Sequence, residues 1–263
     1  MATWADESTN GYDLTANQTP TAATGKFGNC VSLDNGASPD YLSIASCPNI
    51  DWGGTYGDEP IGDLWFWFKG PGPASLVENF VVMVGSNTVR MTADGFIEVR
   101  IKRGDANVWS NTTSVVDYGD DGWHFFYMTL EGATHAAVGD LFLNVWIDNN
   151  LMLDSLHDDN NNVIAATTSL FIGTSVANKS WNGEIDDLGI TVGANPGGVS
   201  TFRDALWNGG DGKSTKDYYA SNYPATQEGY WRLEGSGASP NFFSNPLKHR
   251  GRLSDNIMER IPA

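Results

Sequence analysis

Cysteine is scarce in this chain, whose 263 residues include only Cys30 and Cys47. Two cysteines cannot build the disulfide framework of a small secreted scaffold. They could form a single cross-strand bond, but two reduced, partly buried thiols are the better interpretation of so sparse a pattern. Stability must then come mainly from a hydrophobic core.

Positive charge is also in short supply. The chain has 15 Lys and Arg against 32 Asp and Glu, which gives a net charge of −17 at pH 7. A surface this acidic repels phosphate backbones and anionic lipid headgroups, so we expect neither nucleic acid nor a membrane surface as a partner. The longest dense apolar run, "LWFWF" at 64–68, is far too short to span a bilayer. The opening residues "MATWADESTN" have neither the basic start nor the apolar core of a secretory signal.

Motifs of enzymes are missing as well. None of the four histidines lies beside a Ser or Cys nucleophile motif, and no pair of them has zinc-binding spacing. A retaining glycoside hydrolase needs two carboxyl groups about 5–5.5 Å apart, which on a strand means acidic residues on one face. Glu184 and Asp186 satisfy this alternation, but the third position of the pattern is the apolar Leu188. We therefore expect a protein that is not an enzyme.

Aromatic residues and glycine are plentiful, with 10 Trp, 9 Tyr, 12 Phe and 30 Gly. The aromatic residues can fill a sizeable core, which argues against disorder. About a dozen short alternating segments follow one another at intervals of roughly ten residues, with turn signals between them. This spacing is typical of an all-β sandwich or barrel.

The stretch 64–68 is the clearest strand. Leu64, Phe66 and Phe68 alternate with Trp65 and Trp67, so both faces of the strand are apolar. A strand that is apolar on both faces is expected at the centre of a sandwich, buried on both sides.

Turn signals and one helical pattern complete the expected elements. Tight turns are predicted at "ADG" (93–95) and at "DNN" (148–150). Two alternating runs around a Gly/Pro turn predict a further hairpin within 26–46. Residues 199–207 predict one short helix, which ends at "NGG".

Six segments occur in an order that resembles laminin-G-like domains of the concanavalin A-like lectin/glucanase superfamily: "TGKFGNCVSLDNGASPDYLSIAS", "DLWFWFKGP", "DGWHFFYMTL", "LFLNVWIDNNLM", "SLFIGTS" and "NGEIDDLGI". The resemblance covers about residues 10–215. It implies a jelly-roll sandwich of two antiparallel sheets, with a short helix after the last strand. We accordingly place the jelly roll at 1–215 and a C-terminal extension at 216–263.

The extension contains "YWRLEGSGA", which resembles the first strand of a laminin-G-like domain although it lies near the end of the chain. We predict a strand at 229–238 that buries Tyr230 or Trp231 and Leu233. Three arrangements are open: a permuted strand that closes the chain's own sheet, a strand donated to a neighbouring subunit, or a loosely docked remnant of a longer array.

The residues after this strand form a basic tail on an acidic protein. Its cations are Lys248, Arg250, Arg252 and Arg260. Such a tail could dock on an acidic patch of a neighbouring subunit.

Calcium is the one cofactor that the resemblance suggests, and none is required. Domains of this superfamily often hold Ca²⁺ with an Asp of the last strand, and Asp186 or Asp187 occupies the matching "IDD" position. Asn- and Asp-rich loops could complete the six or more oxygen ligands. The alternative is a carboxylate that accepts hydrogen bonds in a turn, and the phases of Ile185 and Leu188 predict a bulge at this point.

Aromatic rings in loops would serve glycan binding, because a flat ring packs on the apolar face of a sugar. Trp52, Tyr56, Trp109 and Trp181 lie in loop-like or edge-like surroundings. For each of them, a place in the core or in a protein interface is the favoured interpretation, since most of the Trp residues of a sandwich must lie in its core.

The function favoured by these patterns is a non-enzymatic structural protein of a virion, such as a bacteriophage capsid decoration or fibre protein. It would be assembled in the host cytoplasm, and its partners would be other particle proteins and further copies of itself. The alternative is an extracellular carbohydrate-binding module or adhesin whose partner is a cell-surface glycan. Its binding could depend on calcium. A glycoside hydrolase or lyase comes third.

Overall fold

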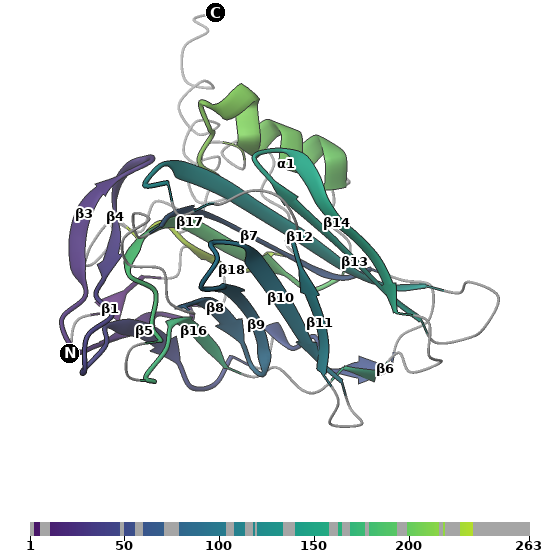
Figure 1. Ribbon diagram of the computed structural model, residues 1–263, viewed down its shortest axis with the longest axis horizontal. Helices are drawn as coiled ribbons and strands as arrows, with labels where there is room; N and C mark the ends of the chain where they lie inside the picture. Colours follow the sequence, from purple (N-terminus) through teal and green to yellow (C-terminus); the bar gives the residue numbers. More distant parts are fainter. Residues whose placement is uncertain are drawn as a thin grey trace, which may run out of the picture.

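The computed structural model describes the chain in fifteen segments: residues 3–5, 11–47, 50–55, 60–70, 79–103, 108–113, 118, 120–133, 140–157, 163–164, 169–176, 179–193, 199–215, 218 and 227–233. Two antiparallel sheets of these residues face each other, with one helix outside them (Figure 1). The predicted all-β jelly-roll sandwich is confirmed.

The first sheet, called sheet A, has eight strands. In spatial order they are β1 (Thr3–Trp4), β2 (Leu14–Asn17), β5 (Tyr41–Ile44), β16 (Leu170–Gly173), β8 (Asn79–Val84), β9 (Asn87–Met91), β10 (Ile97–Lys102) and β11 (Val108–Thr112). The turn at "ADG" joins β9 to β10, as predicted.

The second sheet, called sheet B, also has eight strands. In order they are β14 (Asn150–His157), β13 (Asp140–Ile147), β12 (Trp123–Ala133), β7 (Pro60–Lys69), β17 (Gly183–Thr191), β4 (Gly28–Leu33) and β3 (Thr21–Gly25), and β18 (Gln227–Trp231) also pairs with β17. The turn at "DNN" joins β13 to β14, as predicted. A small separate ladder pairs β6 (Gly54–Thr55) with β15 (Val163–Ile164).

Strand β7 lies near the centre of sheet B and is buried on both faces, as the sequence predicts. Leu64, Phe66 and Phe68 point into the main core between the two sheets. Trp65 and Trp67 point outward into a second aromatic cluster beneath the helix. Each face therefore meets apolar partners, which explains the uninterrupted aromatic run.

Helix α1 (Val199–Trp207) forms where it was predicted and continues into a short 3₁₀ turn, η3 (Asn208–Gly210). It packs over the outer face of sheet B (Figure 1). Phe202 and Leu206 are buried against that face. None of the helices in the described segments is long and apolar enough to cross a membrane.

The prediction of a hairpin within 26–46 is wrong. Strand β4 pairs with β3 and β17 in sheet B, whereas β5 pairs with β2 and β16 in sheet A. The connection between them crosses from one sheet to the other. It is held by Asp40, whose carboxylate accepts hydrogen bonds from the backbone N–H groups of Thr19 and Asp34.

The C-terminal strand pairs with its own chain. Strand β18 runs antiparallel to β17 from Leu188 to Thr191, on the edge that β4 leaves free beyond Ile185. This corresponds to the first of the three arrangements, a permuted strand that completes the chain's own sheet. The strand spans 227–231 instead of 229–238, and residues 234–238 lie outside the described segments.

Both cysteines are buried and free, in agreement with the interpretation as reduced thiols. They lie in different places: Cys30 is on β4, and Cys47 is in the core cluster after β5.

Candidate functional site

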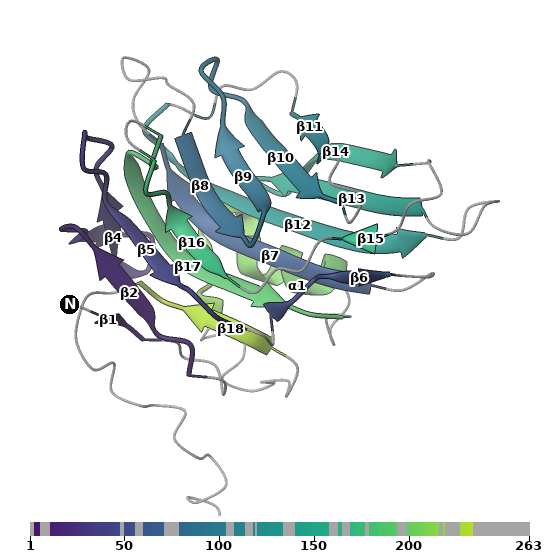
Figure 2. The ribbon, with the colours of Figure 1, turned by 90° about the horizontal axis from the view of Figure 1, so that it is seen from below.

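The outer faces of the two sheets differ in what covers them. On sheet B, α1 covers the aromatic cluster of Trp65, Trp67, Phe125, Tyr127, Phe202 and Leu206. On sheet A no described element crosses the outer face, which is turned toward the viewer in Figure 2 with α1 behind the far sheet. We call this surface the open face.

One row of side chains runs across the whole open face. The strand registers align Thr3, Thr15, Ser43, Phe171, Met83, Thr88, Arg100 and Ser110 from β1 to β11. Side chains alternate between the faces of a sheet, so these residues share the face opposite the core. Hydroxyl groups occupy one end of the row and the apolar Phe171 and Met83 the middle, and the other end contains the buried Thr88, the cation Arg100 and Ser110.

The middle of the open face carries an aromatic pair that is largely buried but still reaches the surface. The rings of Tyr41 and Phe171 lie 6.2 Å apart and are tilted by 35°. Beside them, the amide of Asn17 donates a hydrogen bond of 2.9 Å to the hydroxyl of Ser43. An apolar ring surface next to amide and hydroxyl groups is the combination that binds the two kinds of surface on a sugar.

The other end of the face contains a buried carboxylate held by two arginines. Glu98 accepts hydrogen bonds from Arg90, from Arg100 at 2.9 Å and from the hydroxyl of Ser110. Burial by itself would raise the pKa of Glu98, but these hydrogen bonds outweigh it and lower the pKa below its ordinary value. The carboxylate is therefore ionised and fixes both guanidinium groups on the open face.

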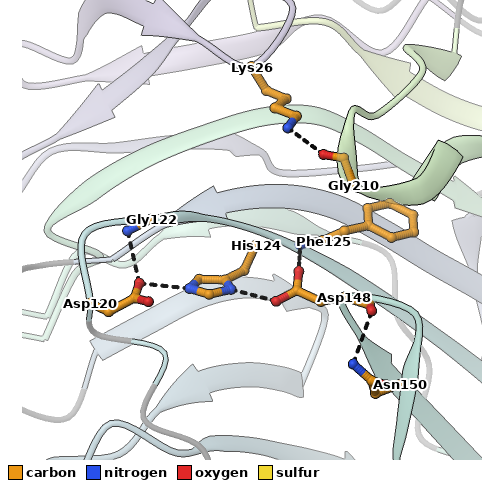
Figure 3. Close-up of polar contacts among 8 residues, drawn as sticks. All are labelled: Lys26, Asp120, Gly122, His124, Phe125, Asp148, Asn150 and Gly210. Carbon is orange, nitrogen blue, oxygen red and sulfur yellow. Dashed lines mark hydrogen bonds and ion pairs between the residues drawn. The ribbon is translucent and has the colours of Figure 1, made fainter.

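A second polar cluster lies at the end of sheet B, around His124 (Figure 3). Its Nδ1 is 2.7 Å from Asp148 in the β13–β14 turn, and its Nε2 is 2.9 Å from Asp120 before β12. Burial by itself would lower the pKa of His124, but the bonds to Asp148 and Asp120 outweigh it and raise the pKa. A protonated imidazole donates to both carboxylates at once, so the cluster clamps the β13–β14 turn to the start of β12.

Asp186 and Asp187 lie at a bulge in β17, where the register against β7 shifts between Asp186 and Gly189. The predicted bulge is confirmed. Asp187 has a φ of +51°, and its carboxylate accepts hydrogen bonds from the backbone and hydroxyl of Thr215 and from the hydroxyl of Tyr230. Asp186 accepts a bond of 2.9 Å from the backbone N–H of Phe27.

These two carboxylates do not fit a calcium ion. Both oxygens of Asp187 are used by protein donors, and within the described segments no group of three or more His, Cys, Asp or Glu side chains gathers to bind a metal. Burial and the charge of Asp187 raise the pKa of Asp186 to about 7. Burial also raises the pKa of Asp187 to about 6, against the effect of its hydrogen bonds from Thr215 and Tyr230. The geometry matches the alternative interpretation, a carboxylate that accepts hydrogen bonds, and the donors Thr215 and Tyr230 link β17 to the segments that follow it.

Three of the four aromatic residues considered for glycan binding are in the core, in agreement with the favoured interpretation, so their rings do not serve glycan binding. Trp52, Trp109 and Trp181 are buried in the main cluster, and the indole N–H of Trp52 donates to the carbonyl oxygen of Thr191 at 2.9 Å. A Trp side chain stabilises a sandwich most when its large apolar surface is removed from water. Tyr56 lies outside the described segments.

The residues singled out in the C-terminal strand are buried as expected. Tyr230, Trp231 and Leu233 have almost no exposed surface, and the indole N–H of Trp231 donates to the carbonyl oxygen of Tyr12 at 2.8 Å. The basic tail residues Lys248, Arg250, Arg252 and Arg260 lie outside the described segments.

The residues of the open face were not found from the sequence. One signal was available: in β10 the charged residues Glu98, Arg100 and Lys102 alternate with three buried aliphatic residues. Alternation of this kind marks a strand with one polar face. The aromatic pair of Tyr41 and Phe171 had no local signal, because β5 and β16 are about 130 residues apart in the chain.

No protein-family model and no curated protein matches the chain. Solved structures do match. The binding domain of Paraclostridial Mosquitocidal Protein 1 aligns with a TM-score of 0.56 at 13% identity, over 79% of this chain and 51% of that chain. The binding domain of botulinum neurotoxin serotype G gives 0.53 at 12% identity, over 76% and 47%, and that of serotype D gives 0.51 at 11%, over 78% and 51%.

At these identities the likeness concerns the fold alone, a β-sandwich of two antiparallel sheets. This chain spans about half the length of the solved structures it matches. The narrower resemblance to laminin-G-like domains, including those of bacteriophage structural proteins, stays a prediction.

Proposed function

We propose that this protein is a non-enzymatic, adhesin-like module that binds carbohydrate on the open face of sheet A. The observation that carries the proposal is the uncovered row of side chains on that face, with the aromatic pair of Tyr41 and Phe171 at its centre and hydrogen-bonding groups on both sides. This replaces the loop aromatics of the sequence-based prediction with residues of the sheet itself.

The solved structures add support of a general kind. The two neighbours with the highest TM-scores given above are described as the binding domains of a mosquitocidal protein and of a neurotoxin, so sandwiches of similar fold belong to proteins that recognise a partner. Because this chain matches only about half of each, what those domains bind is not transferred to it.

The proposal that the protein is not an enzyme draws on the two carboxylate clusters. His124 has a carboxylate at each ring nitrogen, and an imidazole that donates with both nitrogens has no lone pair to act as a base. Asp186 and Glu184 alternate on β17, but Asp186 is buried and Glu184 is paired with Lys69 at 3.8 Å. No cofactor is required by the proposed binding.

The predicted role as a virion component, and with it localisation to a virion, stays a prediction. A lectin-like sandwich is equally compatible with a particle protein that binds glycans and with an extracellular adhesin. Association with other particle proteins or with further copies of the chain likewise stays a prediction.

A glycan array probed with the labelled full chain tests the proposal, with and without EDTA. We expect selective binding that EDTA leaves unchanged, and about tenfold weaker binding for each of Tyr41→Ala and Phe171→Ala. Leu151→Ala is the matched control, because Leu151 is 51% exposed on β14, in the other sheet. An array on which no sugar is bound, or equal binding by all the variants, would contradict the proposal.

A further inference from the structure

Charge is distributed unequally between the two sheets. Among side chains that the structure describes, the strands of sheet A carry Arg90, Arg100 and Lys102 against Glu98, a formal charge of +2. The strands of sheet B carry Lys69 against Asp63, Glu131, Asp154, Glu184, Asp186 and Asp187, a formal charge of −5. On a chain with a net charge of −17, the open face is a local positive region.

Arg100 is the cation of this region that is best placed for a ligand. Its side chain is 39% exposed and its Nε donates to Glu98 at 2.9 Å. Its two terminal nitrogens make no hydrogen bond to any of the described residues. The guanidinium group therefore presents a planar pair of donors to solvent, in the same row of side chains as Phe171.

Glu98 fixes the direction of this guanidinium group. Its side chain is only 7% exposed, and it is held in turn by Arg90 and Ser110. An arginine whose Nε is already bound loses little conformational freedom when its terminal nitrogens bind a ligand. Glu98 is thus a positioning residue, and Arg100 is the group that would touch the ligand.

We propose that Arg100, positioned by Glu98, binds the carboxylate of an acidic saccharide whose sugar ring packs against Tyr41 and Phe171. This inference rests on the proposed function and names the class of ligand. A carboxylate has two coplanar oxygens that match the two terminal nitrogens of an arginine. Between Phe171 on β16 and Arg100 on β10 lie three strand spacings, about 14 Å, so the ligand is a short oligosaccharide.

The test uses isothermal titration calorimetry to measure binding of the full chain to pairs of sugars that differ in whether the carboxyl group is free or esterified. One pair is an oligogalacturonate and its methyl ester, and the other is sialyllactose and its methyl ester. A heparin oligosaccharide provides a sulfated probe. We expect at least one carboxylated sugar to bind about tenfold or more tightly than its neutral partner, and more tightly than the sulfated probe.

Variants identify the site. Arg100→Lys keeps the charge but removes the planar pair of donors, so we expect it to abolish the preference for the carboxylated sugar while binding of the neutral sugar is unchanged. Glu98→Gln should reduce the same preference, because Arg100 loses its charged partner. Lys213→Ala is the control, since Lys213 is an exposed cation that follows α1 on the side of sheet B.

The outcomes separate this inference from the proposed function. Equal binding of the charged and neutral members of each pair would overturn the inference and leave carbohydrate binding intact. Stronger binding of the sulfated probe, or an unchanged preference in Arg100→Lys, would also overturn it. Absence of binding to any of the sugars would overturn both. Far-ultraviolet circular dichroism of each variant checks that the fold is retained.

Discussion

The C-terminal strand gives the sharpest test of the fold, through the substitution Trp231→Ala. Trp231 is completely buried in the main core and donates a hydrogen bond to the carbonyl oxygen of Tyr12, 219 residues earlier in the chain. Removing a buried Trp side chain costs about 3–5 kcal/mol. The carbonyl of Tyr12 loses its donor, which adds about 1 kcal/mol.

For a chain of this size, the resulting loss of about 4–6 kcal/mol lowers Tm by roughly 8–24 °C. Trp231→Phe keeps an aromatic ring in the core but removes the N–H donor and part of the buried volume, so we expect a smaller loss of stability than for Trp231→Ala. Urea and thermal unfolding, followed by tryptophan fluorescence and circular dichroism, measure both variants. Val176→Ala is the control, since Val176 is 49% exposed.

A Trp231→Ala variant with the unfolding midpoint of the parent protein would refute the placement of β18 in the sandwich. The same measurement at several protein concentrations tests the pairing of β18 with its own chain. A Tm that rises with concentration would show that the strand is exchanged between subunits. Mass measurement in solution would then detect the corresponding oligomer.

Three further predictions concern buried titratable groups. The pKa of His124 is raised in the folded protein. The stabilisation that protonated His124 provides is therefore present below its unfolded pKa and is lost as the pH rises through the folded value. Urea unfolding between pH 5 and 9 should show this loss in the parent protein and not in His124→Gln. The pKa of Asp186 is raised to about 7, so between about pH 4 and 7 the folded state binds a proton that the unfolded state does not, and the free energy of unfolding falls as the pH rises. Asp186→Asn should flatten the plot of unfolding free energy against pH in this range. An unchanged slope would contradict the raised pKa of Asp186. Burial raises the pKa of the Cys30 and Cys47 thiols to about 12, so both should react with a thiol reagent only after unfolding, and rapid labelling of the native protein would be evidence against their burial.

The sequence predicted the fold where the pattern was local. The two-faced strand at 64–68, the turns at 93–95 and 148–150, and the helix at 199–207 all lie where alternation, turn residues and helical spacing placed them. Each of these signals depends on neighbours within a few residues, so it does not require knowledge of the partner strands.

The prediction of a hairpin in 26–46 was wrong because it depended on which distant strands the two segments pair with. Two consecutive alternating runs look the same whether they pair with each other or lie in facing sheets. The pairing was decided by β3, β17, β2 and β16, which lie at other points in the chain. For Trp52, Trp109 and Trp181 the sequence favoured the core or an interface but left glycan binding open, because short irregular surroundings do not reveal whether a ring points outward or inward. The structure places all three in the core.

The sequence by itself determined that this is an acidic, all-β protein with too few cysteines for a disulfide framework, and that a strand-like segment lies near its end. Composition and alternation suffice for these conclusions, since they depend on the residues and their immediate spacing. Only the tertiary structure decided which edge the last strand completes and which face remains uncovered. It alone aligns Phe171, Met83, Thr88 and Arg100 in one row, because strand order in a sandwich is set by pairing between distant segments.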